Sequence, residues 1–187
     1  EHGIPKDFIR KINSKNHLDN AWARFESNQI DMEQFDRQFL EETTQGGFSI
    51  RGQDVTDLLG GDLRPRMITI LKQCARDYKI GCLTNNANAG TGSGMSNSQE
   101  RASAVAEVMK LFDAVIESSK EGIRKPDPKI YQLACHRLEV LPTEVVYLDD
   151  LGINLKPARE MGMSTIKVLN EEQAIVDLRE LLSLSEQ

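Results

Sequence analysis

Two adjacent aspartates, Asp149 and Asp150, directly follow the apolar residues 145–148 and precede a helix-like segment. Adjacent carboxylates repel each other, and each of them loses hydration energy if it is buried. A positive partner, either a metal ion or a lysine, would relieve this repulsion, and exposure to solvent would reduce it. The aspartate pair is therefore the first candidate for chemistry in this sequence.

Other polar groups also follow apolar runs. Thr84 and Asn85 end the run at 80–84, and Lys125 lies in the loop after the run at 114–117. Ligands bind beyond the carboxyl ends of parallel strands, so we expect these side chains to share one face with the two aspartates. A hydroxyl with free backbone N–H groups can cradle a phosphate, and a lysine supplies positive charge. The carboxylates would recruit Mg²⁺, so the set predicts a phosphate and magnesium site.

The amino-acid composition limits the kinds of molecule that this chain is expected to bind. The chain has 187 residues, 39% hydrophobic and 28% charged, which suits a soluble domain, and its net charge of −6 gives no basic face for nucleic acid or membrane. We expect a small-molecule partner, with oligomeric state left open. The three cysteines predict reduced thiols, and they form no cluster with metal-ligand spacing. Without an apolar run of membrane-spanning length or a signal-like start, cytoplasmic location is the default expectation.

Residues 1–62 predict a small all-helical domain. Apolar residues recur at helical spacing in 18–27 and 31–43, and no convincing strand is found there. We interpret the aromatic residues of these segments as a hydrophobic core rather than a substrate pocket: they are Trp22, Phe25, Phe35 and Phe39.

Residues 63–187 predict an α/β domain with a parallel sheet covered on both faces, since strands and helices alternate. The expected strands are at 80–84, 114–117, 145–148 and 164–169. A helix at 64–79 should bury Met67, Leu71, Cys74 and Tyr78 on one face. The Gly- and Ser-rich stretch at 86–98 is expected to be a poorly ordered loop.

Three motifs carry a family resemblance. "CLTNN", "IRKPDPKIYQLAC" and "VVYLDDLGINLKPAREMGM" occur in this order, and together they resemble the haloacid dehalogenase-like (HAD) superfamily. The sequence looks most like the subgroup that contains the N-terminal phosphatase domain of soluble epoxide hydrolase. The resemblance runs over residues 64–184. It implies a Rossmann-like HAD core at 63–187 and a helical cap at 1–62.

The resemblance also implies residue roles. Thr84 matches the phosphate-binding hydroxyl, with Asn85 beside it, and Lys125 matches the lysine of the next motif. Asp150 matches the direct Mg²⁺ ligand, and Asp149 matches the neighbouring carboxylate in the outer coordination shell of the metal. The implied activity is a Mg²⁺-dependent phosphatase that acts on a small organic phosphate through an aspartyl-phosphate, with Thr84 and Lys125 as catalytic residues.

One motif of the family has no match. The strand ending in D-x-D, which supplies the nucleophilic aspartate, should precede the cap, but residues 1–20 are polar and Asp7 does not follow a strand. In the family this strand lies between the strand of Asp149 and the strand of Thr84. We therefore expect it upstream of these residues. Without it, the inner edges of 80–84 and 145–148 should lack hydrogen-bond partners.

Several alternatives stay open. Each motif alone also fits an ordinary turn or helix start. A metal-independent dehalogenase would not need the acidic pair, a receiver domain would place it before the threonine and lysine, and a non-catalytic binding module would lack the nucleophile altogether. We also expect Lys125→Met to preserve or raise thermal stability, on the view that Lys125 is needed only in a working site.

Overall fold

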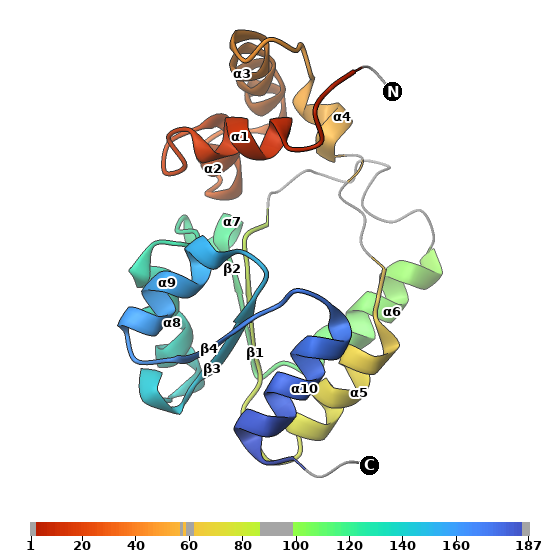
Figure 1. Cartoon of the computed structure of the whole chain (residues 1–187), viewed down its shortest axis with the longest axis vertical. Coiled ribbons are helices and arrows are strands. Elements are labelled where there is room, and N and C mark those ends of the chain that lie inside the picture. Colours follow the sequence, from red (N-terminus) through yellow and green to blue (C-terminus); the bar gives the residue numbers. More distant parts are fainter. Residues whose placement is uncertain (1–2, 57, 59–61, 87–98, 185–187) are drawn as a thin grey trace. The chain divides into compact units, whose positions relative to one another are not determined.

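The computed structural model describes residues 3–56, 58, 62–86 and 99–184 (Figure 1). Apart from Asn86, the predicted loop at 86–98 lies outside these residues. The chain divides into two compact units: the first contains residues 1–61, 85–102 and 117–124, and the second contains 62–84, 103–116 and 125–187. The predicted division into a cap at 1–62 and a core at 63–187 stays a prediction.

The first unit is helical. Its helices are α1 (Phe8–Ser14), α2 (Ala21–Glu26), α3 (Met32–Gln45), α4 (Gly52–Thr56) and α7 (Ser118–Glu121). The buried residues of its core are Ala21, Phe25, Phe35, Phe39 and Val55, and Trp22 packs against them. The predicted aromatic core is confirmed.

Local signals explain where α3 begins. The Asp31 carboxylate accepts a hydrogen bond from the backbone N–H of Gln34, and the Gln34 side chain accepts one from the backbone N–H of Asp31. This reciprocal capping box satisfies two N–H groups that would otherwise lack partners at the helix start.

The second unit is α/β, as predicted. Its elements are α5 (Pro65–Cys74), β1 (Gly81–Thr84), α6 (Gln99–Met109, which begins in the first unit), β2 (Ala114–Glu117), α8 (Pro128–Leu138), the 3₁₀ turn η1 (Pro142–Glu144), β3 (Val146–Asp149), α9 (Gly152–Glu160), β4 (Ser164–Lys167) and α10 (Glu171–Leu182). The four predicted strands are all present, and β4 ends two residues early. No helix within the described ranges is long and apolar enough to cross a membrane.

The strands form two separate two-stranded sheets. β1 pairs with β2, and β3 pairs in parallel with β4, with Val146 opposite Ser164 and Asp149 opposite Lys167. Asp149 is therefore the last residue of its strand, where the sequence placed it just after the strand. The described strands do not form one continuous sheet, and the sequence predicted such a gap where the family's first strand is missing. The predicted break between the strand of Asp149 and the strand of Thr84 is where the two sheets separate.

Helices cover both faces of β3. Val146 and Leu148 pack on a cluster built from α5, α10 and β4, which includes Ile70, Ile166 and Leu178. Tyr147 points to the opposite face and meets Tyr131 of α8, with ring centroids 5.4 Å apart. This alternation is the period of two that strand geometry imposes, and it gives the layered arrangement in Figure 1.

The face predicted for the helix at 64–79 is only partly confirmed, because Met67 and Leu71 are half-buried. α5 ends at Cys74, so Tyr78 lies beyond the helix and is 43% exposed. The buried residues of α5 are Ile70 and Cys74. The predicted helix therefore extended five residues too far.

Candidate functional site

The candidate site begins with a buried ion pair at the end of β3. Lys125 Nζ lies 2.8 Å from Asp149 Oδ2, and the two side chains are only 12% and 4% exposed. Lys125 is placed by the residues that follow it: Asp127 accepts a hydrogen bond from the backbone N–H of Lys129, and Pro128 is the first residue of α8. These are standard helix-start signals, and they set Lys125 three residues before the helix.

The Asp149 carboxylate is saturated with donors. Its Oδ2 atom accepts from Lys125 Nζ and from the Tyr147 hydroxyl at 2.7 Å, and its Oδ1 atom accepts from the backbone N–H of Leu151 at 2.8 Å. Asn154 Nδ2 lies 3.1 Å from both oxygens. A carboxylate offers about four lone-pair sites. Asp149 therefore has no site left for direct binding of a metal.

These contacts explain the ionisation of Asp149. Burial raises the pKa of its carboxyl group, but the hydrogen bonds from Lys125 and Tyr147 and the lysine's charge lower it by more, so the net pKa lies below the usual value of 3.8. Burial, followed by the hydrogen bond to Asp149, raises the pKa of Tyr147 far above its ordinary range. Tyr147 thus stays a protonated donor and Asp149 stays a carboxylate.

A second tyrosine closes this network. The Tyr131 hydroxyl donates to the backbone carbonyl of Asn154 at 2.7 Å, and Asn154 in turn donates to Asp149. Tyr131 and Asn154 are buried, and the Tyr131 ring meets the Tyr147 ring edge-on. The network ties α8, β3 and α9 together around one carboxylate.

Asp150 has different surroundings. It is exposed, and its carboxylate makes no hydrogen bond or ion pair with the part of the chain that the structure describes. Mg²⁺ takes oxygen ligands, keeps several waters and is held by as few as one or two carboxylates. The donor set therefore fits a magnesium ion held by Asp150, with Asp149 holding Lys125 beside it. Among the described residues, no group of three or more His, Cys, Asp or Glu side chains could hold a metal alone.

The structure brings only part of the predicted set into direct contact. Thr84 is the last residue of β1 and is half-buried. Asn85 follows Thr84 and is also half-buried. The roles of Thr84, Asn85, Lys125, Asp149 and Asp150 stay predictions.

Asn86, which the sequence analysis passed over, is fixed by the turn after β2. Its backbone N–H donates to the Ser118 hydroxyl, which donates to the Asn86 carbonyl, both at 3.0 Å. Its side chain donates to Glu117 and accepts from the Ser119 hydroxyl at 3.0 Å. Ser118 and Ser119 are buried. This network anchors the chain two residues after Thr84.

Sequence reasoning also missed Tyr147 and Asn154. Tyr147 looked like one more apolar strand residue, and Asn154 like a polar residue of a helix. One signal was available: Tyr147 is two residues before Asp149, so the two side chains share one face of the strand.

The comparisons with known proteins agree with this architecture. The family model described as haloacid dehalogenase-like hydrolase matches residues 6–162. The chain belongs to this family. It is thus a hydrolase by family, as predicted from its three motifs.

The proteins with similar sequences are named for different activities. Acyl-CoA dehydrogenase family member 10 of Mus musculus is 34% identical over 185 residues, which is 96% of this chain and 16% of that protein. Bifunctional epoxide hydrolase 2 of Sus scrofa is 44% identical over 81 residues, or 43% of this chain and 15% of that protein. (S)-2-haloacid dehalogenase 4A of Burkholderia cepacia is 36% identical over 59 residues, or 32% of this chain and 26% of that protein. The chain spans between about a seventh and a quarter of these relatives.

Solved structures support the fold. A predicted HAD-like family hydrolase from Porphyromonas gingivalis matches with a TM-score of 0.65 at 22% identity, covering 97% of this chain and 85% of that one. A HAD family enzyme from Bacteroides thetaiotaomicron, in complex with magnesium and inorganic phosphate, matches with a TM-score of 0.56 at 18% identity, covering 86% of this chain and 82% of that one. At these identities the likeness concerns the fold alone.

Proposed function

We propose that this chain belongs to a Mg²⁺-dependent phosphatase that acts on a small organic phosphate through an aspartyl-phosphate intermediate. The observation that carries the proposal is the buried Lys125–Asp149 pair directly beside the exposed Asp150. Such a pair supplies a fixed ammonium and an accessible carboxylate at one strand end. This combination suits a phosphate dianion with its counter-cation. A relative in the same family binds magnesium and phosphate, which is consistent with this chemistry.

Each residue has a role in the proposal. Asp150 would hold Mg²⁺, which supplies charge neutralisation at the phosphate oxygens when bound. Asp149 keeps the Lys125 ammonium charged and directed, and Lys125 binds a phosphate oxygen. Thr84 donates its hydroxyl to another phosphate oxygen, with Asn85 beside it. Lys125 and Asp149 are already paired before the substrate arrives, so little reorganisation of these two groups is needed during the reaction.

The proposal needs a nucleophilic aspartate from elsewhere. Asp7 is the cap residue of α1 rather than the end of a strand, and its carboxylate pairs with Lys11 at 2.8 Å. Asp149 is saturated by its donors. We therefore infer that the nucleophile is supplied by a segment upstream of these residues.

Asp150→Asn is the direct test. In the polypeptide expressed from the complete coding region, it should reduce Mg²⁺-dependent hydrolysis of p-nitrophenyl phosphate by more than the roughly 10- to 100-fold typical of losing a group that only supports a metal ligand. Its melting temperature should stay unchanged because Asp150 is exposed. Glu160→Gln, also an exposed acid, is the matched control and should retain activity. Unchanged turnover in Asp150→Asn would remove Asp150 from the site.

A binding module without turnover is the second candidate. The observation that favours it is the lack of a nucleophile candidate among the described aspartates beside Lys125. It predicts that residues 1–187 and the polypeptide from the complete coding region both bind phosphate and Mg²⁺, and that neither hydrolyses the ester. Hydrolysis by the complete polypeptide rejects this candidate.

A further inference from the structure

Thr84 and Lys125 each lie beside a peptide bond at which the chain passes between the two units. One stretch of the second unit ends at Thr84, and the next residue, Asn85, belongs to the first unit. Likewise, Arg124 ends a stretch of the first unit and Lys125 begins one of the second. Consecutive Cα atoms lie only about 3.8 Å apart. Contacts that hold the neighbouring residues within the first unit therefore limit where Thr84 and Lys125 can be.

Arg124 is held within the first unit by its side chain. Its Nε and Nη2 atoms lie 2.8 and 2.7 Å from Glu26 Oε2, and its Nη1 atom donates to the carbonyl of His17 at 2.9 Å. The Arg124 and Glu26 side chains are only 20% and 12% exposed, and Trp22 donates to the second oxygen of Glu26. A planar guanidinium with all three nitrogens engaged has little freedom to move. The residue directly before Lys125 is thus fixed.

The chain after Thr84 is held by residues 117–124, which we name the anchor segment and which end at Arg124. The hydroxyl of Ser118, a fully buried residue, accepts from the backbone N–H of Asn86 and donates to its carbonyl, both at 3.0 Å. The side-chain oxygen of Asn86 accepts from the hydroxyl of Ser119, also at 3.0 Å. One short segment therefore holds the chain beside both proposed phosphate-binding residues.

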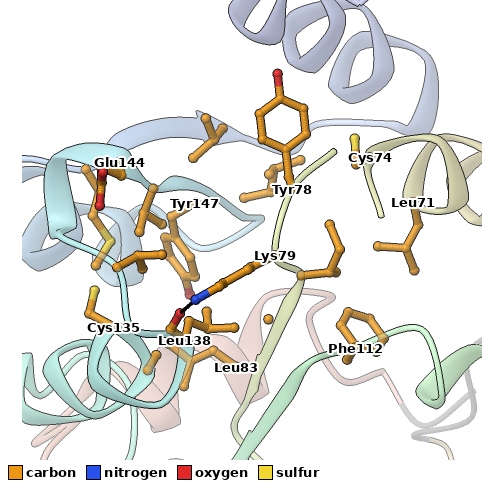
Figure 2. Close-up of a pocket in the computed structure, with 18 of the residues that line it drawn as sticks. Leu71, Cys74, Tyr78, Lys79, Leu83, Phe112, Cys135, Leu138, Glu144 and Tyr147 are labelled. Carbon is orange, nitrogen blue, oxygen red and sulfur yellow. Dashed lines mark hydrogen bonds between the residues drawn. The ribbon is translucent and has the colours of Figure 1, made fainter. Parts of the chain in front are cut away.

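Within the second unit, no strand pairing among the described residues links Thr84 to the Lys125–Asp149 pair. Thr84 ends β1 and Asp149 ends β3, and these strands belong to separate sheets. A cavity of about 600 Å³ borders both strands, with Leu83 and Tyr147 in its wall (Figure 2). It lies where the family's first strand is expected, so it offers no separate ligand site. The anchor segment is a connection between Thr84 and Lys125 that does not depend on that strand.

We propose that the anchor segment positions Lys125 and Thr84 for phosphate binding. Arg124 is the positioning residue for Lys125 and acts through the peptide bond that joins them. Ser118 is the positioning residue for Thr84 and acts through Asn86. The inference rests on the proposed function, because that function assigns both anchored residues to the phosphate. A misplacement of about 1 Å at a reacting group costs about 100-fold in rate, so contacts away from the substrate have a large effect.

The first experiment measures how firmly Lys125 is held and needs no turnover. The polypeptide from the complete coding region is treated with a limiting amount of acetic anhydride, and mass spectrometry follows the acetylation rate of each lysine. The Lys125 side chain is 12% exposed, so it should react slowly in the wild type. Arg124→Met should raise this rate by roughly tenfold, because the loop that carries Lys125 then opens more often.

Arg51→Met is the matched control. Arg51 also pairs with an acid inside the first unit, through hydrogen bonds of 3.1 and 2.9 Å to Asp36, but it lies beside neither Thr84 nor Lys125 in the chain. It should leave the acetylation rate of Lys125 unchanged. Circular dichroism checks that each variant folds. If Arg124→Met does not fold, Arg124→Lys replaces it, with a smaller expected increase.

The second experiment measures hydrolysis of p-nitrophenyl phosphate by the same polypeptide. Arg124→Met and Ser118→Ala should each lower kcat/KM by about 10- to 100-fold, the usual range for residues that orient a functional group. The Mg²⁺ concentration for half-maximal activity should not change, because the anchor segment does not hold Asp150. Arg124→Lys keeps a cation for Glu26 and should recover part of the loss, whereas Arg51→Met should lose no activity. A general loss of stability would not separate the variants in this way.

Equal acetylation rates of Lys125 in Arg124→Met and Arg51→Met would overturn the proposal, whether or not the polypeptide has phosphatase activity. Normal kcat/KM in Arg124→Met and Ser118→Ala would also overturn it, provided that Lys125→Met abolishes turnover. Normal turnover in Lys125→Met would instead reject the proposed function. The acetylation rates alone would then decide whether Arg124 holds Lys125 in place.

Discussion

At the scale of single residues, Lys125 is both a candidate phosphate ligand and part of a buried ion pair. Removing its charge leaves Asp149 buried with only neutral donors, and breaking a buried pair is destabilising. We predict that Lys125→Met lowers the free energy of unfolding by about 2 kcal/mol at pH 7, below the 3–5 kcal/mol of a fully unpaired charge because three neutral donor groups remain. This reverses the expectation from the sequence alone. Lys129→Met, at an exposed position, is the control in a urea titration; equal effects of the two substitutions would contradict the prediction.

The Lys125–Asp149 pair makes the free energy of unfolding depend on pH. The pKa of Asp149 is lower in the folded protein than its usual value of 3.8, so its stabilising contribution is complete above about pH 4 and is lost as pH falls through the lower folded pKa. The stability difference between wild type and Lys125→Met should therefore be constant from pH 5 to 7 and shrink below about pH 4. Urea titrations at several pH values measure it. A difference that grows on acidification would contradict the assignment.

Tyr147 has a separate prediction. Tyr147→Phe removes one hydrogen bond to Asp149 and keeps the ring, so the pKa of Asp149 should rise and stability should fall by about 1 kcal/mol. Carboxyl carbon chemical shifts during an acid titration report this pKa. Tyr78→Phe, at the exposed Tyr78, should change neither quantity. A normal Asp149 titration in Tyr147→Phe would show that the hydroxyl does not act on the carboxylate.

The contrast between Asp150 and Tyr147 shows what could be predicted at residue scale. Asp149, Asp150 and Lys125 were singled out because three motifs occur in order at three strand ends, although each motif alone also fits an ordinary turn or helix start. Tyr147 was not singled out, because its apolar ring fits the strand pattern. Its hydroxyl donates the hydrogen bond to Asp149. The direct contact of Lys125 with Asp149 could be expected from strand topology, but its saturation by four donor groups could not.

At the scale of elements, the positions of most helices and all four strands were predictable, because periodicity and capping are local. α7 was missed, since four residues give too short a periodic signal. The pairing of strands was not predictable from local patterns, because it depends on which backbones are available in space. The separation of β1 from β3 followed only from the missing family motif.

The loop after β2 gives a prediction at this scale. Arg124 Nη2 lies 2.7 Å from Glu26 Oε2, and its Nη1 donates to the carbonyl of His17 at 2.9 Å. Trp22 donates to the other oxygen of Glu26. Arg124→Met should therefore cost about 2 kcal/mol, as for hydrogen bonds to a charged group. Urea unfolding followed by the fluorescence of Trp22, the single tryptophan, measures this cost.

Lys120→Met is the matched control for Arg124→Met. Lys120 pairs with Glu117 but is 68% exposed, and exposed pairs contribute at most about 1 kcal/mol. If the two substitutions have the same effect, the Arg124 pair does not hold residues 117–124 to the first unit.

At the scale of the whole molecule, each unit has a hydrophobic core of its own. One is the cluster around Phe25 and Phe35, and the other is built from α5, β4 and α10 and includes Ile175. Burial of apolar side chains stabilises each core separately. Chains with more than one core often unfold in more than one step. We therefore expect the two cores to unfold in separate steps.

We therefore predict that Ile175→Ala and Phe25→Ala act on different unfolding steps. Each removes buried apolar volume, at a cost of about 3 kcal/mol. Ile175→Ala should speed hydrogen exchange in β4 and α10 and leave the Trp22 fluorescence transition where it was, since Trp22 packs on the first core. Phe25→Ala should shift the Trp22 transition to lower urea with little effect on exchange in α10. If both substitutions move both probes equally, the two cores unfold as one cooperative unit.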